Sequence, residues 1–292
     1  MGRMTRADLT AVWHRAATTS SALGTGVGRF LARCLDGGYH PQDTDVAHDA
    51  IGITVDNVSV AYGKRQALEG LTGAFAPGTL NAVAGPNGAG KSSLLKVLAG
   101  MRPPRSGHIT YSQPTAGRLA YLPQQSELDR DYPITVAELV ALGAWRRFGA
   151  FRQAPDNLIK PIEETIAGVG LEGNAHRLIG ELSAGQFQRA LFARLILQDA
   201  AVILLDEPFA AIDEGTTAEL LRLVRRWSEE RRTVIAVLHD LDQVRAHFPA
   251  TLLLARRCIA WGDTGTTLTA DNLALARDAM RAPHRHSAGA AA

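Results

Sequence analysis

A glycine-rich segment between an apolar run and a helical pattern limits the possible folds of this chain most strongly. Leu80–Ala84 has the composition of a short buried strand and leads into Gly85-Pro86-Asn87-Gly88-Ala89-Gly90-Lys91-Ser92. This segment fits G-x-x-x-x-G-K-[ST], in which glycines permit a tight turn and backbone N–H groups point at phosphate oxygens. Residues 91–99 then have helical spacing, and Gly100 ends it. Strand, glycine loop and helix in this order predict an α/β fold that binds a nucleotide.

The end of the glycine loop carries groups expected to contact phosphates. The helix starting at Lys91 adds the positive end of its dipole, and the Lys91 side chain can reach the outer phosphates. The Ser92 hydroxyl is a candidate Mg²⁺ ligand, and Ser93 is a further candidate for nucleotide binding. A chance match in a glycine-rich turn is the alternative, against which the flanking strand and helix argue.

An apolar strand that ends in two acids is the second candidate part of the site. Residues 202–205 are aliphatic, and Asp206 and Glu207 follow them. We expect this strand at the centre of the sheet, with its two acids pointing to opposite sides. Asp206 is a candidate for holding a Mg²⁺-bound water, and Glu207 for orienting or deprotonating the water that attacks ATP. A solvated strand end is the alternative, but the glycine loop favours catalysis.

Three further residues have both a structural and a functional interpretation. His239 ends the aliphatic strand 233–238, where a histidine is usually structural, but this strand is expected beside that of Asp206, within reach of a γ-phosphate. Gln124 alone is an ordinary loop amide. Tyr62 ends the strand Ile53–Tyr62 and is either a core aromatic or a surface on which adenine stacks.

Ser183-Ala184-Gly185-Gln186 precedes a helical pattern and in isolation predicts a helix cap. Serine is a favourable N-cap, and the helix dipole favours an anion at the same end. The cap and an anion site are physically compatible. Ser183, Gly185 and Gln186 are therefore further candidates for contact with a phosphate.

The composition indicates a globular protein without a strong electrostatic field. Of 292 residues, 46% are hydrophobic and 21% charged, and the formal net charge of +2 gives no indication of nucleic-acid binding. Cys34 and Cys258 form no disulfide framework, so we expect a reduced, cytosolic protein. No apolar run approaches the roughly 20 residues that span a bilayer, so at a membrane other subunits would have to cross it.

The patterns divide the chain into three parts. Residues 1–48 are expected to be a poorly ordered extension, and residues 51–265 the folded domain, with a helical subdomain at about 125–182. Residues 266–292 form a tail whose end is expected to be disordered. We interpret His284 and His286 in that tail as solvated side chains, because a tetrahedral metal site needs about four ligands.

Residues 51–265 resemble the ATP-binding subunits of ABC transporters. The glycine loop looks like their Walker A motif, and residues 202–207 look like Walker B with its catalytic glutamate. Gln124 matches the Q-loop glutamine, His239 the switch histidine and Tyr62 the adenine-stacking aromatic.

Two more segments extend the resemblance. Residues 210–213 match the D-loop, and residues 182–186 resemble the signature motif Leu-Ser-Gly-Gly-Gln. Ala184 replaces the first glycine of that motif, which puts only its fine geometry in doubt. The resemblance implies a P-loop NTPase (ABC-type ATPase) core with a β-rich N-terminal part and an inserted helical subdomain.

The resemblance also implies cofactors and partners. ATP and Mg²⁺ would bind, with Ser92, Gln124 and Asp206 toward the metal, and Glu207, His239 and Lys91 would be catalytic. Two copies would meet head to tail, so that the signature segment of one closes the ATP site of the other. This homodimer would serve membrane permease subunits, and indirectly a solute-binding protein, at the cytoplasmic face of the membrane.

Similarity in several short sequence segments indicates the cargo. Residues 122–129, 132–136, 186–194 and 238–242 look like those of subunits that import divalent metals, chiefly zinc and manganese, and possible cargoes include iron. Haem, an iron chelate or an exported compound is the alternative cargo. A translation factor would need two ATPase domains, a DNA-repair ATPase would need long coiled coils, and a non-catalytic regulator would not require Glu207 and His239.

Overall fold

A three-stranded antiparallel sheet forms one layer of the computed structural model, which describes residues 49–144 and 158–281. Its strands are β1 (Ile53–Tyr62), β2 (Arg65–Phe75) and β4 (Ser106–Tyr111), in the order β2-β1-β4. The alternation of buried residues along β1 breaks at Asn57, which has a positive φ of 47° where the pairing register shifts. Such a bulge bends the sheet over the helix beneath it.

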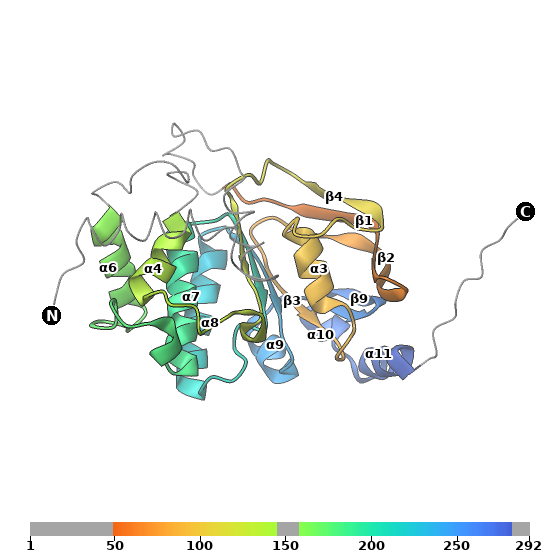
Figure 1. Cartoon of the computed structure of the whole chain (residues 1–292). Coiled ribbons are helices and arrows are strands. Elements are labelled where there is room, and N and C mark those ends of the chain that lie inside the picture. The colour runs from red at the N-terminus through yellow and green to blue at the C-terminus, as the bar shows by residue number, and fades with distance from the viewer. Residues whose placement is uncertain (1–48, 145–157, 282–292) are drawn as a thin grey trace, which may run out of the picture.

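A six-stranded sheet forms the centre of the molecule (Figure 1). Its order is β5-β6-β7-β3-β8-β9, and all pairs are parallel except the last. The strands are β3 (Leu80–Ala84), β5 (Leu119–Leu122), β6 (Val202–Asp206), β7 (Thr233–Val237), β8 (Ala250–Ala255) and β9 (Arg257–Asp263). Every residue of β3, β6 and β7 is buried, as expected for parallel strands covered on both faces.

Helix α3 (Lys91–Leu98) lies between the two sheets (Figure 1). Leu94, Leu95 and Leu98 are fully buried and belong to one hydrophobic cluster with β1, β2 and β3. This packing fixes the axis of α3, and with it the direction in which the preceding glycine loop faces.

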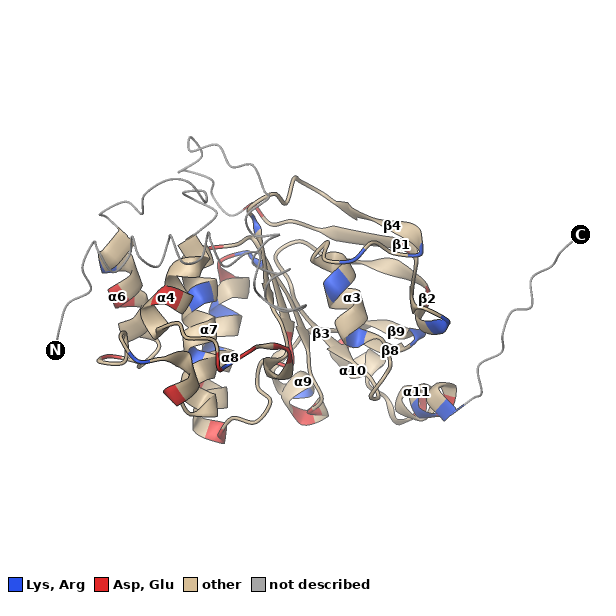
Figure 2. Ribbon diagram, viewed as in Figure 1, with Lys and Arg blue, Asp and Glu red and all other residues tan. Residues whose placement is uncertain are grey.

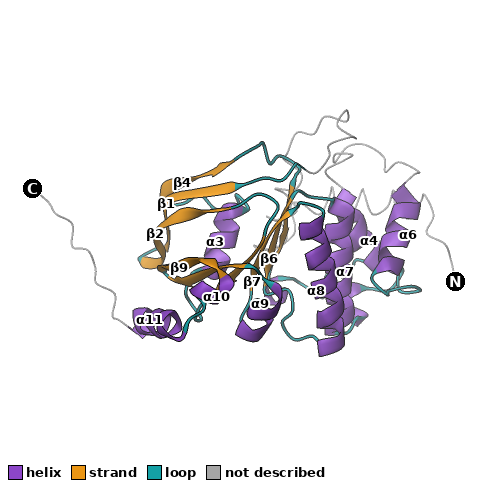
Figure 3. Cartoon of the chain, turned by 180° about the vertical axis from the view of Figure 1, so that it is seen from behind, coloured by secondary structure: helices purple, strands orange, loops and turns teal. Residues whose placement is uncertain are grey.

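The helices between β5 and β6 form a separate group at the other side of the sheet (Figures 1 and 3). They are α4 (Val136–Ala141), α6 (Ile159–Gly168) and α7 (Ala184–Gln198), with short 3₁₀ turns at Gln125–Glu127, Leu142–Ala144 and Ile179–Glu181. Helix α7 packs on both α4 and α6 and carries buried residues along most of its length. The predicted helical insertion in an α/β sheet is therefore confirmed.

The remaining described helices are α8 (Glu214–Glu229), α9 (Leu241–His247), α10 (Thr264–Thr267) and α11 (Ala270–Arg281). Helix α11, which falls in the expected tail, packs on β8 and β9. Helices α6, α8 and α11 each carry charges of both signs, in line with the small net charge (Figure 2). Within residues 49–144 and 158–281, no helix has the length and apolar character needed to cross a membrane.

Candidate nucleotide site

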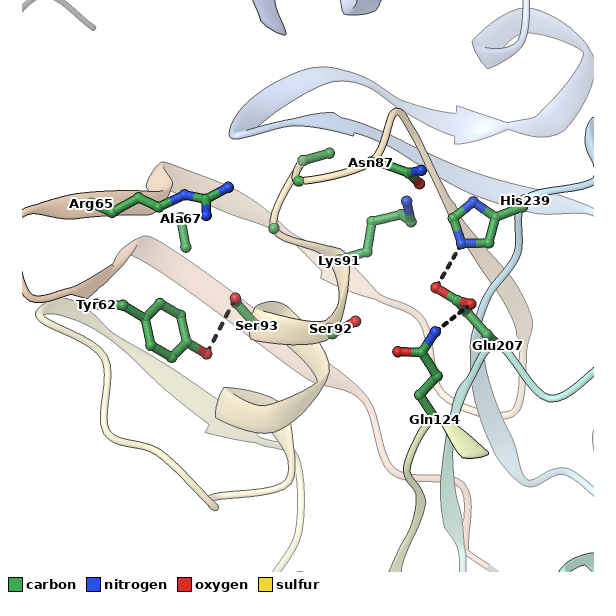
Figure 4. A pocket seen from close by; sticks show the side chains of 13 residues that line it. Tyr62, Arg65, Ala67, Asn87, Lys91, Ser92, Ser93, Gln124, Glu207 and His239 are labelled. Atoms are coloured by element: carbon green, nitrogen blue, oxygen red, sulfur yellow. Dashed lines mark hydrogen bonds and ion pairs between the residues drawn. The ribbon is translucent and has the colours of Figure 1, made fainter. Parts of the chain in front are cut away.

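The glycine loop and the ends of the parallel strands border an open cavity of about 650 Å³ (Figure 4). Ligand pockets commonly have this volume and lie at the carboxyl ends of parallel strands. The cavity lining comprises Tyr62, Arg65, Ala67, Asn87, Gly88, Ala89, Gly90, Lys91, Ser92, Ser93, Gln124, Glu207 and His239. Most predicted site residues are thus brought together, and Arg65 and Ala67 are additions from β2. Gly85, Pro86, Asp206, Ser183, Gly185 and Gln186 do not line it.

Two glycines give the loop its path because no other residue fits there. Gly85 has φ +146°, and a Cβ at this position would lie 2.0 Å from the carbonyl oxygen of Leu254. Gly90 has φ +97°, and its Cβ would lie 2.3 Å from the carbonyl oxygen of Ala67. The loop can pass this close to β8 and β2 only with glycine at both positions.

Lys91 holds the loop in its present shape. Its Nζ donates hydrogen bonds to the carbonyl oxygens of Gly85, at 2.8 Å, and Pro86, at 3.1 Å. Burial lowers the pKa of Lys91, while the carboxylates of Glu207 and Asp206 oppose that shift. The ammonium group is thus a desolvated cation at the loop, positioned to exchange these carbonyls for phosphate oxygens.

Asp206 is a buried carboxylate behind the cavity lining. It is 1% exposed, and its Oδ1 accepts a hydrogen bond of 3.1 Å from the Ser92 hydroxyl. Burial raises the pKa of Asp206 to about 6, although the hydrogen bond from Ser92 acts in the opposite direction. A hydroxyl and a carboxylate in contact, with the Gln124 amide lining the same cavity, are hard oxygen donors that fit Mg²⁺.

Glu207 is held between two side chains that come from neighbouring strand ends (Figure 4). Gln124 Nε2 donates to its Oε2 at 2.8 Å, and His239 Nε2 lies 2.6 Å from its Oε1. Strand β7 pairs directly with β6, as predicted, and this pairing brings His239 beside Glu207. Because a carboxylate can only accept, His239 Nε2 carries the proton in this contact.

Tyr62 is no core residue, since its side chain is 43% exposed and borders the cavity. The guanidinium carbon of Arg102 lies 4.1 Å from the centroid of the Tyr62 ring, and Arg102 does not line the cavity. Ser93 Oγ donates to the Tyr62 hydroxyl at 3.4 Å. One face of the ring is therefore backed by a cation, and the cavity side remains open to a flat ligand.

The Ser183 segment begins helix α7 and forms two capping hydrogen bonds within its own chain. The Ser183 hydroxyl accepts from the Gln186 backbone N–H at 3.2 Å, and Gln186 Oε1 accepts from the Ser183 N–H at 3.1 Å. This is the predicted cap in the form of a capping box. Ala184 occupies the first helical position, where its methyl group is compatible with the helix. The segment reaches no part of the cavity in its own chain.

Comparisons with known proteins identify similar ATP-binding proteins of transport systems. The family model for the ABC transporter domain matches residues 68–210. The chain is 34% identical to the manganese transport system ATP-binding protein MntB of Listeria monocytogenes over 226 residues, which cover 76% of this chain and 94% of that protein. It is 34% identical to the zinc transport system ATP-binding protein TroB of Treponema pallidum, over 77% of this chain and 86% of that protein.

A solved structure is similar as well. A metal-chelate type ABC transporter in an inward-facing conformation superposes with a TM-score of 0.70 at 28% identity, covering 78% of this chain and 89% of that chain.

Among residues 49–144 and 158–281 of the present chain, no group of three or more His, Cys, Asp or Glu could hold a metal ion. His284 and His286 lie outside the described residues.

Proposed function

Because the chain belongs to the ABC transporter family of ATP-binding proteins, we propose that it is the ATP-hydrolysing subunit of an importer for divalent metal ions. The main support for ATP hydrolysis is the position of Glu207. Gln124 and His239 hold this carboxylate at the cavity that the glycine loop borders. The names of the relatives, which transport manganese or zinc, support the cargo.

ATP would lie across the cavity from Tyr62 to Glu207. The adenine would stack on the open face of Tyr62, and the phosphates would follow the loop toward Lys91. Lys91 would exchange the carbonyls of Gly85 and Pro86 for the outer phosphates, which are stronger partners for a desolvated ammonium group.

When bound, Mg²⁺ would neutralise charge on the outer phosphates. Ser92, Asp206 and Gln124 are the residues that would hold it, Asp206 through a bound water. The buried Asp206 carboxylate would be stabilised in its charged form by that cation.

Glu207 would orient the attacking water and accept its proton. The water oxygen forms a bond to the γ-phosphorus while the bond from that phosphorus to the β–γ bridging oxygen breaks. The hydrogen bonds from Gln124 and His239 keep the carboxylate in one orientation, and His239 is positioned to contact the γ-phosphate.

The rest of the site would come from a second copy. Ser183, Gly185 and Gln186 of one copy would cover the γ-phosphate held by the glycine loop of the other, in a head-to-tail homodimer. The dimer would work at the cytoplasmic face of the membrane with permease subunits and, through them, a solute-binding protein. Haem, an iron chelate or an exported compound is the alternative cargo.

Metal accumulation in cells tests this proposal. Cells carrying Lys91→Ala should accumulate less zinc or manganese than cells carrying the natural chain, with iron measured in parallel. Lys160→Ala is the matched control, because Lys160 lies on α6 with a side chain that is 83% exposed. Unchanged accumulation of all three metals in Lys91→Ala cells would contradict the proposed cargo.

A further inference from the structure

A buried bridge of two side-chain amides joins three segments that are far apart in the sequence. Gln125 Nε2 donates to Gln188 Oε1 at 2.5 Å, and Gln188 Nε2 donates to the carbonyl oxygen of Pro208 at 2.6 Å. Since a carbonyl can only accept, the contact with Pro208 fixes the orientation of the Gln188 amide. Gln188 is 1% exposed, so its hydrogen bonds are made away from water.

Both ends of the bridge are next to residues of the candidate site. Gln125 follows Gln124, which donates to Glu207, and Pro208 follows Glu207 itself. Covalent and hydrogen bonds therefore close a ring through Glu207, Gln124, Gln125, Gln188 and Pro208. A ring of this kind restricts the Glu207 carboxylate from both its backbone and its side chain.

The bridge also reaches the helix whose N-terminus is Ser183. Gln188 lies in the second turn of α7, and Ser183 is the N-cap of the same helix. A further contact anchors the Gln125 segment on the opposite side, because Lys96 of α3 pairs with Glu127 at 2.6 Å. The short stretch from Gln124 to Glu127 is thus tied to the phosphate-loop helix, to Glu207 and to α7.

We propose that Gln188 is a positioning residue for ATP hydrolysis that acts through Gln125 and Pro208 on the Glu207 carboxylate. This inference rests on the proposed role of Glu207 but is independent of the cargo.

Gln198 provides a matched control on the same helix. Its Nε2 also donates to a backbone carbonyl, that of Leu119, at 3.1 Å. Leu119 is the first residue of β5 and does not border the cavity. Gln198→Leu therefore removes a side-chain hydrogen bond from α7 to a backbone carbonyl but leaves the contacts of Gln125, Gln188 and Pro208 unchanged.

The test uses the purified full-length chain and the variants Gln188→Leu, Gln125→Leu, their double variant, and Gln198→Leu. Steady-state ATPase activity gives kcat and KM, and urea unfolding gives the stability of each variant. We expect Gln188→Leu to lower kcat about tenfold with KM within about twofold of the natural chain, the effect of losing one buried, aligned hydrogen-bond pair. The double variant should be no slower than Gln188→Leu, because both changes break the same bridge.

Several results would overturn the inference. A folded Gln188→Leu variant with unchanged kcat, equal losses of kcat in Gln188→Leu and Gln198→Leu, or losses that multiply in the double variant each contradict it. If Gln188→Leu does not fold, Gln125→Leu decides, since Gln125 is only partly buried; unchanged kcat there overturns the proposal. A natural chain that fails to hydrolyse ATP would contradict the proposed function instead.

Discussion

The glycine-loop cavity and the N-terminus of α7 are both predicted phosphate sites, yet they are built in opposite ways. The cavity holds charged groups that are buried and incompletely compensated, such as Lys91 and Asp206. At the N-terminus of α7, the capping box of Ser183 and Gln186 pairs two of the first backbone N–H groups within the chain. The cavity therefore lowers the stability of the chain in exchange for binding, whereas the cap stabilises its helix by about 1 kcal/mol.

This difference indicates how each of the two sites would receive a phosphate. In the cavity, phosphates and a cation would relieve the desolvation of groups that already face each other. Ser183 does not line the cavity of its own chain, so a phosphate at Ser183 would be one that is not bound in that cavity. Four predictions test this contrast between the cavity, which is lined by residues of one chain, and the N-terminus of α7, for which we propose a role in the site of a second copy.

The largest expected effect is on catalysis in the cavity. Glu207→Gln should lower the ATPase rate by about 10²- to 10⁴-fold, because an amide cannot accept the proton of the attacking water. Nucleotide binding should remain, so that excess ATP traps a dimer detectable by size-exclusion chromatography. Glu214→Gln, at an exposed position on α8, is the control. A Glu207→Gln variant that stays monomeric and hydrolyses ATP normally would contradict the mechanism.

The second prediction concerns the N-terminus of α7. In the Glu207→Gln background, Ser183→Arg should abolish the ATP-dependent dimer, while the Kd for ATP stays within about twofold, because Ser183 does not line its own cavity. Thr135→Ala is the matched control, since Thr135 forms the same kind of capping box with Glu138 on α4. Both changes should cost about 1 kcal/mol of stability, and only Ser183→Arg should prevent dimerisation. Equal dimerisation of the two variants would show that Ser183 does not lie in the dimer interface.

The third prediction concerns how the buried Asp206 carboxylate affects the stability of the chain. In metal-free buffer at pH 7.5, Asp206→Asn should unfold with a free energy about 1–3 kcal/mol higher than the natural chain, because an amide has no charge to desolvate. The folded pKa of about 6 lies above the ordinary value of 3.8, so the penalty of the charged form is absent below pH 4. It grows between pH 4 and 6 and is complete above that range. Urea titrations at these pH values measure the difference, and a constant difference across them would contradict the assignment.

The smallest expected effect is at the edge of the cavity. Tyr62→Ala should weaken ATP binding about tenfold, because base stacking on an aromatic ring contributes roughly 1–3 kcal/mol. Binding of inorganic triphosphate, which has no base, should not change. Arg102→Ala should give a weaker effect of the same kind, since Arg102 lies over the Tyr62 ring and does not line the cavity. Isothermal titration with both ligands measures this, and an equal loss for ATP and triphosphate would place the phosphates, not the base, near Tyr62.

Local sequence was sufficient wherever one continuous segment forms the feature. The strand, glycine loop and helix at residues 80–98 have the predicted order, as do β5 and β6, with Asp206 as the last residue of β6 and Glu207 directly after it. The predicted cap at Ser183 is present for the same reason, because a capping box uses only residues three apart. The break in the alternation of β1 at Asn57 is likewise visible in both the sequence and the register.

Several elements were not predicted, namely β2, β9 and the helices α9, α10 and α11. Strand β2 carries Gly70 and Gly73 and lacks regular alternation, and it is held by pairing with β1 and by Trp261, whose ring would clash with any Cβ at Gly73. Arg65 and Ala67 were missed from the cavity lining because their strand was missed. Helix α11 could have been predicted from its helical spacing of apolar residues, because Leu273, Ala276 and Met280 are three and four residues apart.

The sequence by itself determined the glycine loop, the apolar strands and the acids at their ends, because each depends on contacts within a few residues. The sequence also predicted that the strand of His239 lies beside that of Asp206, and β7 does pair with β6. Only the tertiary structure decided that Gln124 and His239 both contact the Glu207 carboxylate. It alone brought Gln125, Gln188 and Pro208 into one bridge. The physical reason is that such contacts join residues up to 83 positions apart, and no local pattern records which distant carbonyl or carboxylate a side-chain amide will meet.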